Sequence, residues 1–266
     1  MFNFTRIKTI ISKEWAEIFK NRVVLFTIIL MPLMLTLLPL GMLFFFGNSS
    51  AMQAGDSADV PAQFIAVCGN MPMMDCMKVF VINEFMLMYM IIPVMIPVAI
   101  AAYSIVGEKT THSLEPLLAT PITTEELLAG KALAAVIPAV IATWGCFLLF
   151  ILISPLTGIS KAVHAYIMGP TWLLAILLLG PLMSIVSVNF AIFVSSRTAD
   201  PRVAEQISAA LIVPIMLVLF GQIAGIVVLN VKLVLLSALV LALLDVGLVW
   251  LTARLFKRET ILTGWK

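Results

Sequence analysis

The sequence predicts an all-α integral membrane protein with six transmembrane helices and both termini on the cytoplasmic side. Three observations predict this class: the composition, the number of long apolar segments, and the distribution of Lys and Arg. Of the 266 residues, 62% are hydrophobic and 11% are charged, whereas a soluble globular domain has about 45–50% apolar and about 25% charged residues. The mean hydropathy is +1.13. This composition excludes a soluble enzyme, a disordered chain and a nucleic-acid-binding domain.

Six segments are long enough to cross a membrane, because a transmembrane helix needs about 20 consecutive apolar residues. They are residues 23–46, 85–106, 132–154, 171–195, 207–231 and 233–253, and the predicted membrane domain covers residues 23–253. Only Lys232 separates the last two, so a short re-entrant turn near Gly221 and Gly225 is the alternative boundary. Those two glycines also form a Gly-x-x-x-Gly pair, which favours the close approach of another helix.

The distribution of Lys and Arg predicts the orientation. Six spans place both termini on one side, and cytoplasmic loops carry an excess of Lys and Arg. If both termini are cytoplasmic, all of the 16 Lys and Arg residues except Lys78, Lys161 and Lys232 lie in cytoplasmic segments. We therefore expect an external loop at residues 47–84, a cytoplasmic loop at 107–131 and a cytoplasmic tail at 254–266.

The first 22 residues are predicted to form an amphipathic helix at the cytoplasmic membrane interface. Apolar side chains recur there with helical spacing, and such helices lie in the plane of the interface. The apolar face comprises Ile7, Ile10, Ile11, Trp15, Ile18 and Phe19. Two roles are open for this helix: a simple membrane anchor, or an element that transmits force to the spans.

The sequence contains no recognisable arrangement of residues for catalysis or metal binding. His112 and His164 fall on opposite sides of the membrane in the predicted topology, so they cannot share a metal ion. Gly130 and Lys131 lack the earlier glycine and the following Ser or Thr of a phosphate-binding loop. We therefore expect the chain to bind no metal or cofactor and to hydrolyse no ATP by itself.

Asp245 is the one charged residue within the six predicted spans. A carboxyl group at membrane depth is costly unless it is protonated or paired, and the amides of Asn189 and Gln222 are its expected partners. Packing between helices is the simplest interpretation of these three residues. The alternative is an ion-coupled carrier or channel in which Asp245 binds the ion.

The predicted external loop contains Cys68 and Cys76, which would face an oxidising compartment. A disulfide that closes this short segment is the simplest interpretation. The alternative is a Cu(I) site built from soft thioether ligands. The methionines that would supply these ligands are Met71, Met73, Met74 and Met77.

The cytoplasmic loop, GEKTTHSLEPLLATPITTEELLAGK, is the most informative segment. Ser113 is placed to cap a short helix. Thr123 and Glu126 form a Thr-x-x-Glu capping box, which predicts the start of a second helix that continues into the third span. The short helix exposes Leu117 and Leu118, which suits it to fill a groove on a partner protein. The alternative is that it lies on the bilayer surface.

At this loop the sequence resembles the ABC-2-type transporter permeases, the membrane subunits of ATP-driven exporters. The most specific run is LEPLLATP, within SLEPLLATPITTEELLAGK. Three further segments resemble the same family: KEWAEIFKNR before the first span, SSRTADPRVAEQIS between the fourth and fifth spans, and LFKRETIL near the C-terminus. Together these segments extend the resemblance over the whole chain.

The resemblance implies a dimer of six-span subunits in a prokaryotic cytoplasmic (inner) membrane, each bound to a separate subunit that holds ATP and Mg. The second permease is either another copy of this chain or a related permease. The resemblance places the coupling helix, which contacts the ATPase, at Ser113, Leu114, Glu115, Pro116, Leu117, Leu118, Thr120 and Pro121. A second cytoplasmic contact, or a set of internal salt links, is assigned to Arg197, Asp200, Arg202 and Glu205.

The expected cargo is amphiphilic, lipid-like or drug-like, because the spans offer almost no polar side chains to line a pathway. An exporter of sodium or copper ions is an alternative within the same family. Two other classes stay open: a standalone ion-coupled carrier or channel that uses Asp245, and a membrane scaffold or sensor that moves no cargo.

Overall fold

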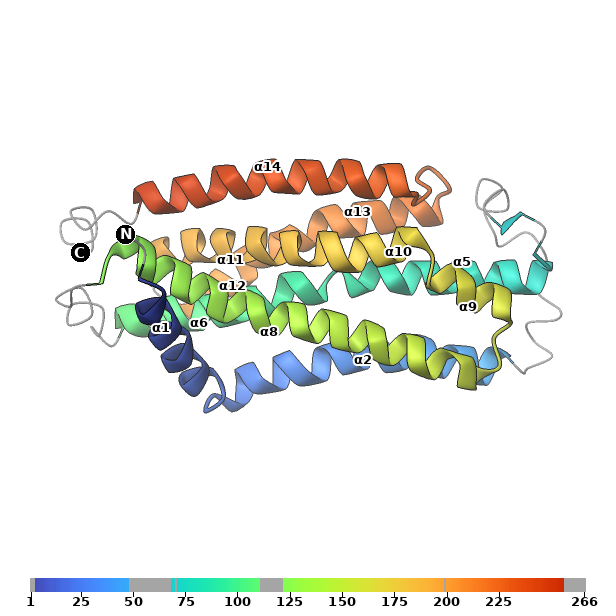
Figure 1. The fold of residues 1–266 in the computed structure, drawn as a ribbon, viewed down its shortest axis with the longest axis horizontal. Coiled ribbons are helices and arrows are strands. Elements are labelled where there is room, and N and C mark those ends of the chain that lie inside the picture. Colours follow the sequence, from blue (N-terminus) through green and yellow to red (C-terminus); the bar gives the residue numbers. More distant parts are fainter. Residues whose placement is uncertain (1–2, 48–67, 70, 111–121, 199, 256–266) are drawn as a thin grey trace.

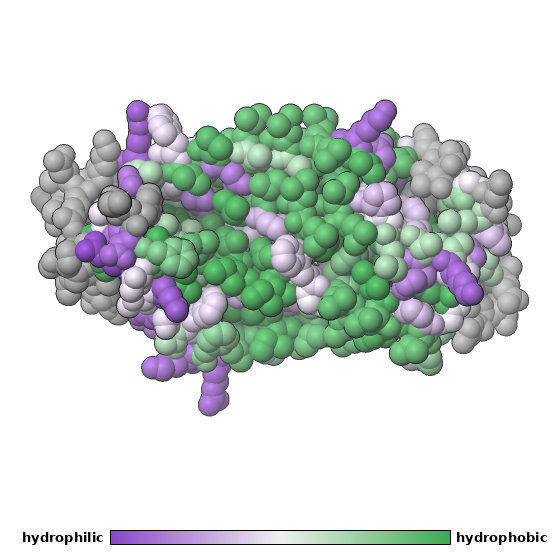
Figure 2. Space-filling view, in the orientation of Figure 1, coloured by the Kyte–Doolittle hydropathy of each residue, from purple (hydrophilic) through white to green (hydrophobic). Residues whose placement is uncertain are grey.

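The computed structural model describes residues 3–47, 68–69, 71–110, 122–198 and 200–255. Within these residues the regular elements are helical, and most of them run side by side along one long axis (Figure 1). Six helical segments are long and apolar enough to cross a membrane, which confirms the predicted number of spans. Apolar side chains form a broad central band, and hydrophilic ones gather towards the two ends (Figure 2), as expected for a bundle that crosses a bilayer.

The chain begins with a short helix that is set at a steep angle to the bundle (Figure 1). This helix, α1 (Phe4–Ile18), starts at Asn3, whose side chain accepts a hydrogen bond from the Thr5 N–H. It packs against α8 rather than standing alone. The first span follows as α2 (Arg22–Gly47). We call the end of the bundle that carries α1 the α1 end, and the opposite end the far end.

The second span is longer than predicted and consists of two helices, α5 (Met73–Tyr89) and α6 (Ile92–Thr110). Helix α5 begins at Met73 rather than Phe85, so residues 73–84 are helical and the expected loop 47–84 is wrong over this part. The reason is that a hydropathy window detects only the apolar stretch, whereas a helix can continue beyond it. Helix α6 carries Pro93 in its first turn, a position that tolerates the missing N–H.

The third and fourth spans also extend past their predicted ends. The third is α8 (Thr124–Ile153), which starts at the predicted capping box, continues through the apolar segment expected from residue 132, and is followed by η2 (Ser154–Thr157). The fourth combines α9 (Lys161–Ile167), α10 (Pro170–Leu174), a π-helical turn η3 (Ala175–Leu179) and α11 (Gly180–Arg197). The Trp144 indole of α8 donates to the Ile176 carbonyl within η3 at 3.1 Å, so this irregular turn is held by a neighbouring helix.

The last two spans are joined by a short turn. The fifth combines α12 (Pro201–Ser208), η4 (Ala209–Leu211) and α13 (Ile212–Ile223), and the sixth is α14 (Val231–Leu255). The fifth therefore ends at Ile223 rather than residue 231. The turn reverses direction because Gly225 adopts φ 70° and the Gly221 carbonyl accepts the N–H groups of Ile226 and Val227. Since Gly225 lies beyond α13, the expected Gly-x-x-x-Gly helix face is not formed.

The second span forms the centre of the bundle and the last two spans lie at its edge. Within their most apolar windows, 78% of the residues of the second span are buried inside the protein, but only 17% of those of the sixth. Helix α6 packs against α8 and α11, whereas α13 packs chiefly on α5, and α14 on α11. The core is therefore built around α5 and α6.

Truncating a core side chain of α6 tests this arrangement. Ile96 is fully buried, so we expect Ile96→Ala to lower the free energy of unfolding by about 2–5 kcal/mol through loss of contacts and a residual cavity. Thermal unfolding of the detergent-solubilised protein measures the change. The control is Leu243→Ala on α14, where the side chain is 67% exposed; an equal loss of stability in both variants would contradict the central position of α6.

Candidate functional site

The predicted coupling helix lies in a segment outside the described residues. Residues 111–121 contain Ser113 to Pro121, including Leu117 and Leu118, so the structure places none of these side chains. The two ends of the segment are described. Helix α6 ends at Thr110 and α8 begins at Thr124, so the site is defined by what holds these two ends.

The capping box predicted at the start of α8 is confirmed. The Thr123 hydroxyl accepts from the Glu126 N–H at 3.2 Å, and the Glu126 carboxylate accepts from the Thr123 N–H at 3.0 Å. The same carboxylate accepts from the Asn3 N–H at 2.9 Å and forms an ion pair with Arg6 at 3.4 Å. Glu126 therefore also ties the start of α1 to the start of α8.

About two turns after the start of α8, a group of charged and polar side chains joins α1, α6 and α8. We call it the base cluster; it comprises Lys13, Glu14, Ser104, Glu108 and Lys131. The Lys131 ammonium lies 2.8 Å from the carboxylates of both Glu14 and Glu108. Ser104 donates to Glu14 at 2.6 Å, and Lys13 pairs with Glu108 from the more exposed side. Two carboxylates and two ammonium groups thus balance one another.

Most of the base cluster is removed from solvent. Glu14, Glu108 and Lys131 are each less than 9% exposed. Burial would raise the pKa of Glu14, but the charge of Lys131 and the hydrogen bonds from Lys131 and Ser104 outweigh it, so the pKa lies below its ordinary value. Burial would likewise lower the pKa of Lys13, yet its hydrogen bond and charge interaction with Glu108 raise it. Both groups are therefore held in their charged forms at neutral pH.

Apolar contacts hold α1 against α8 around the base cluster. Ile10 and Leu127 form a small buried cluster, and Ile10 lies so close to Gly130 that a Cβ there would meet its Cγ2 atom at 2.7 Å. The Trp15 indole donates to the Ala134 carbonyl at 3.0 Å. Gly130 therefore permits the close approach of the two helices, and α1 and the first turns of α8 form one packed unit.

The apolar face predicted for α1 is partly wrong. Phe19 is 62% exposed, whereas the Glu14 carboxylate is buried on the face that packs into the bundle. Glu14 stands four residues after Ile10 and four before Ile18, so its position in the apolar stripe was a signal in the sequence. Its partners Ser104, Glu108 and Lys131 carried no such signal, because they come from distant segments.

The four residues assigned to a second cytoplasmic contact lie around the start of α12. Among the described residues none of the four is in an ion pair, so the expected internal salt links are not found. The Asp200 side chain instead caps α12 by accepting from the Arg202 N–H at 2.8 Å. Arg197 stacks over the Phe193 ring at 4.8 Å, and Glu205 is half-buried.

The three polar residues predicted within the spans do not pair with one another. Asp245 is buried, and neither of its carboxyl oxygens has a hydrogen-bond partner in the part of the chain that the structure describes. Asn189 donates to the Ile185 carbonyl, and the Thr252 hydroxyl of α14 lies 3.4 Å from its Oδ1 atom. Gln222 lies near Glu84 of α5, but neither side chain has a hydrogen-bond partner among the described residues. The expected pairing of Asp245 with either amide is therefore wrong.

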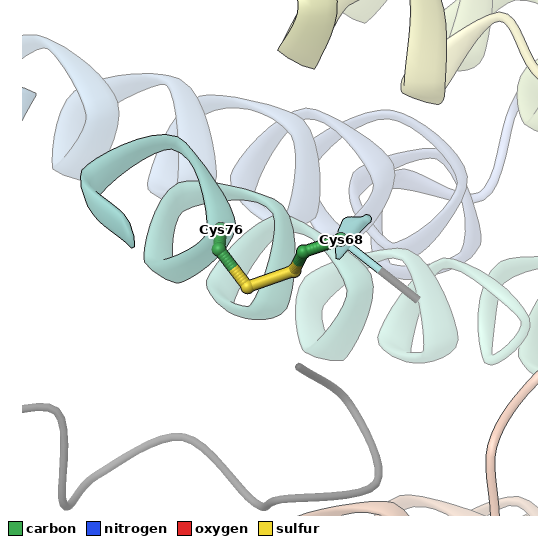
Figure 3. The surroundings of a disulfide bond; sticks show 2 residues. All are labelled: Cys68 and Cys76. Carbon is green, nitrogen blue, oxygen red and sulfur yellow. A yellow bond between two sulfur atoms is a disulfide. The ribbon is translucent and has the colours of Figure 1, made fainter. Parts of the chain in front are cut away.

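Cys68 and Cys76 are joined by a disulfide at the far end of the bundle (Figure 3). Their Cα atoms lie 5.5 Å apart, a normal separation for such a bond. The bond anchors residue 68 to the first turn of α5. Of the four nearby methionines, Met71 and Met77 pack against the main apolar core.

The base cluster is a structural connection between α1, α6 and α8. Among the described residues, no group of three His, Cys, Asp or Glu side chains is arranged to hold a metal ion. The buried ions of the cluster are paired with one another, and they join three helices at the two ends of residues 111–121.

A comparison with models of protein families identifies the family of this chain. The model of the ABC-2 family transporter proteins matches residues 8–252. The chain belongs to this family. The match includes α1 from Lys8 onwards and all six spans, so the base cluster lies inside the ABC-2 region. Neither a curated protein nor a solved structure gives a significant match. This ABC-2 protein is thus a permease, a membrane-embedded component of a transport system.

Removing the central charge of the base cluster should destabilise the ABC-2 permease. Lys131→Met leaves the buried carboxylates of Glu14 and Glu108 with only the more exposed Lys13 as a charged partner, which we expect to cost up to about 3–5 kcal/mol. Thermal unfolding in detergent measures the loss, and limited proteolysis reports whether α1 detaches first. Lys20→Met is the control, because Lys20 is exposed and outside the cluster; if both variants unfold alike, the cluster does not hold α1.

The lowered pKa of Glu14 makes part of this stability dependent on pH. A carboxyl group with a lowered pKa stabilises the folded state above its ordinary value of 4.5 and loses that contribution as the pH falls through the lowered value. We therefore expect the wild-type protein to lose more stability than Glu14→Gln on acidification below pH 4.5. Parallel unfolding curves across a pH series measure this difference, and identical slopes would contradict it.

Proposed function

We propose that the chain is the membrane subunit of an ABC exporter, and that ATP is hydrolysed by a separate subunit which binds residues 111–121. The observation that carries the proposal is the base cluster, which joins both ends of this segment to α1 in an ABC-2 permease. Leu117 and Leu118 are the apolar contacts, and Glu115 is a polar contact, with the partner. The ATP and Mg belong to that partner.

The proposed mechanism uses the rigidity of the α1 end. Movement of the ATPase on binding ATP displaces the segment between α6 and α8. Because α1, α6 and α8 are joined by buried ion pairs and close packing, they shift as one body and carry the central span with them. The pathway then changes its access from the cytoplasm to the outside. The exposed groups Arg197 and Arg202 near α12 offer a second contact for the ATPase.

We propose an amphiphilic or lipid-like cargo, taken from the cytoplasm or the inner leaflet of a prokaryotic cytoplasmic membrane. The working unit is a dimer of this chain with itself or with a related permease, with the α1 end in the cytoplasm. The composition of the spans supports this cargo class, since they offer almost no polar side chains to solvate a hydrophilic molecule.

Co-purification tests the docking of an ATPase. We expect the tagged chain, extracted from its native membrane in mild detergent, to bring an ATP-binding subunit with it. The double variant Leu117→Asp, Leu118→Asp should lose that subunit, because two charges replace the apolar contacts. The matched control is Leu156→Asp in η2, which is 78% exposed at the other end of α8 and should retain it. Repeated isolation of the wild-type chain alone would overturn the proposal.

A second candidate function rests on Asp245. Its buried carboxyl group has no hydrogen-bond partner among the described residues, as expected for a site that binds a proton or cation during transport. An ion-coupled carrier would lose all transport in Asp245→Asn. The exporter would keep transport driven by ATP, so vesicle assays with and without ATP separate the two functions.

A further inference from the structure

The far half of the bundle contains an apolar cavity between the last two spans. Helix α13 packs on α5, and α14 packs on α11 and η3, and between these contacts lies a cavity of about 430 Å³. Its polar side chains are Ser187 and Ser237, and their hydroxyls donate to carbonyls of their own helices. Since no polar group in the wall needs a partner, the cavity suits an apolar occupant.

The depth of the cavity corresponds to one leaflet of a bilayer. Its wall extends from Leu229 in the turn before α14 and Leu233 in the first turn to Leu244. Leu233 and Leu244 are separated by about 16 Å along the helix axis, at about 1.5 Å per residue. Half of a typical hydrocarbon core is about 15 Å thick. The cavity thus runs from the far-end interface to the middle of the membrane.

The cavity is open to the surroundings of this chain. Leu236, Val240 and Leu244 line it, and each is between 48% and 59% exposed. A chain of the surrounding bilayer can therefore enter from the side, without passing through the core. The volume lies within the range of about 300–1,000 Å³ that is usual for ligand pockets.

We propose that this cavity binds one alkyl chain of an anionic membrane lipid from the far-end leaflet. The chain lies between α13 and α14 against Ser187 and Ser237. We assign the preference for an anionic head group to Lys232, which is exposed and directly precedes the cavity-lining Leu233 in the first turn of α14. Lys232 forms no ion pair with the other described residues, so its ammonium is available to a phosphate or carboxylate group.

The lipid site is independent of the proposed export function. It lies within one subunit and at the far half of the bundle, whereas the proposed ATPase contact lies at the α1 end. A lipid held between α13 and α14 fills the space that these two spans leave between them. Failure of the docking experiment would therefore leave this proposal unaffected.

Photolabelling in vesicles tests the site. The full chain is reconstituted with a phosphatidylglycerol that carries a diazirine in the middle of one alkyl chain, and labelled residues are mapped by mass spectrometry. We expect strong labelling of cavity residues such as Leu236 and Val240. Leu243, which is exposed but outside the cavity, gives the level of labelling by ordinary bilayer lipid.

Variants at three positions decide the outcome. Ser237→Trp, or the smaller change Ser237→Leu, should fill the cavity and lower its labelling several-fold relative to Leu243, whereas Leu239→Trp on the outer surface of α14 should not. Lys232→Gln should remove the preference for phosphatidylglycerol over a phosphatidylcholine with the same chains. Cavity labelling no stronger than at Leu243, or unchanged in both Ser237 variants, would overturn the alkyl-chain site. Equal labelling by both lipids in the wild type would overturn its anionic character.

Discussion

The ammonium group of Lys131 joins α1, α6 and α8 at the α1 end of the bundle, and the position of α1 and of both ends of residues 111–121 depends on it. It lies 2.8 Å from the carboxylates of Glu14 and Glu108, so one buried charge joins helices that begin far apart in the sequence. Such ions are costly to bury unless each is paired, and here the two acids and two lysines balance. The arrangement leaves α1 no freedom to act as a loose anchor, because its position is set by both ends of the segment between α6 and α8.

The spans differ in how far they are buried: those at the centre of the bundle are largely buried, and those at its edge are largely exposed. Helices α5 and α6 are surrounded by the other spans, while α13 and α14 expose most of their length. A rigid unit at the α1 end attached to a buried central span suits the transmission of movement, since packed cores shift as bodies rather than deform continuously. The loosely joined pair α13 and α14 leaves a cavity that the bilayer itself can fill.

Polar groups within the spans are satisfied mainly by their own helices. The hydroxyls of Thr36, Thr143 and Ser184 each donate to the carbonyl four residues earlier, which is the local solution open to Ser and Thr in a helix. The carboxyl group of Asp245 has no hydrogen-bond partner among the described residues, and the same is true of the side chains of Glu84 and Gln222. The same reasoning explains why pairing by residue type misassigned Asn189, whose amide donates to the Ile185 carbonyl one turn earlier in its own helix.

The sequence by itself determined the features that depend on composition and on neighbours along the chain. The apolar runs predicted six spans, and Thr123 with Glu126 predicted the start of α8, because a span and a cap each need only residues close in sequence. Other ends of the spans were misplaced, because α5 continues as a helix beyond its most apolar stretch and α13 stops at Ile223. Only the tertiary structure decided that Glu14 faces inwards to Ser104, Glu108 and Lys131, since its partners lie 90 or more residues away. The cavity between α13 and α14 was likewise decided by packing, because it depends on how helices meet and not on any one segment.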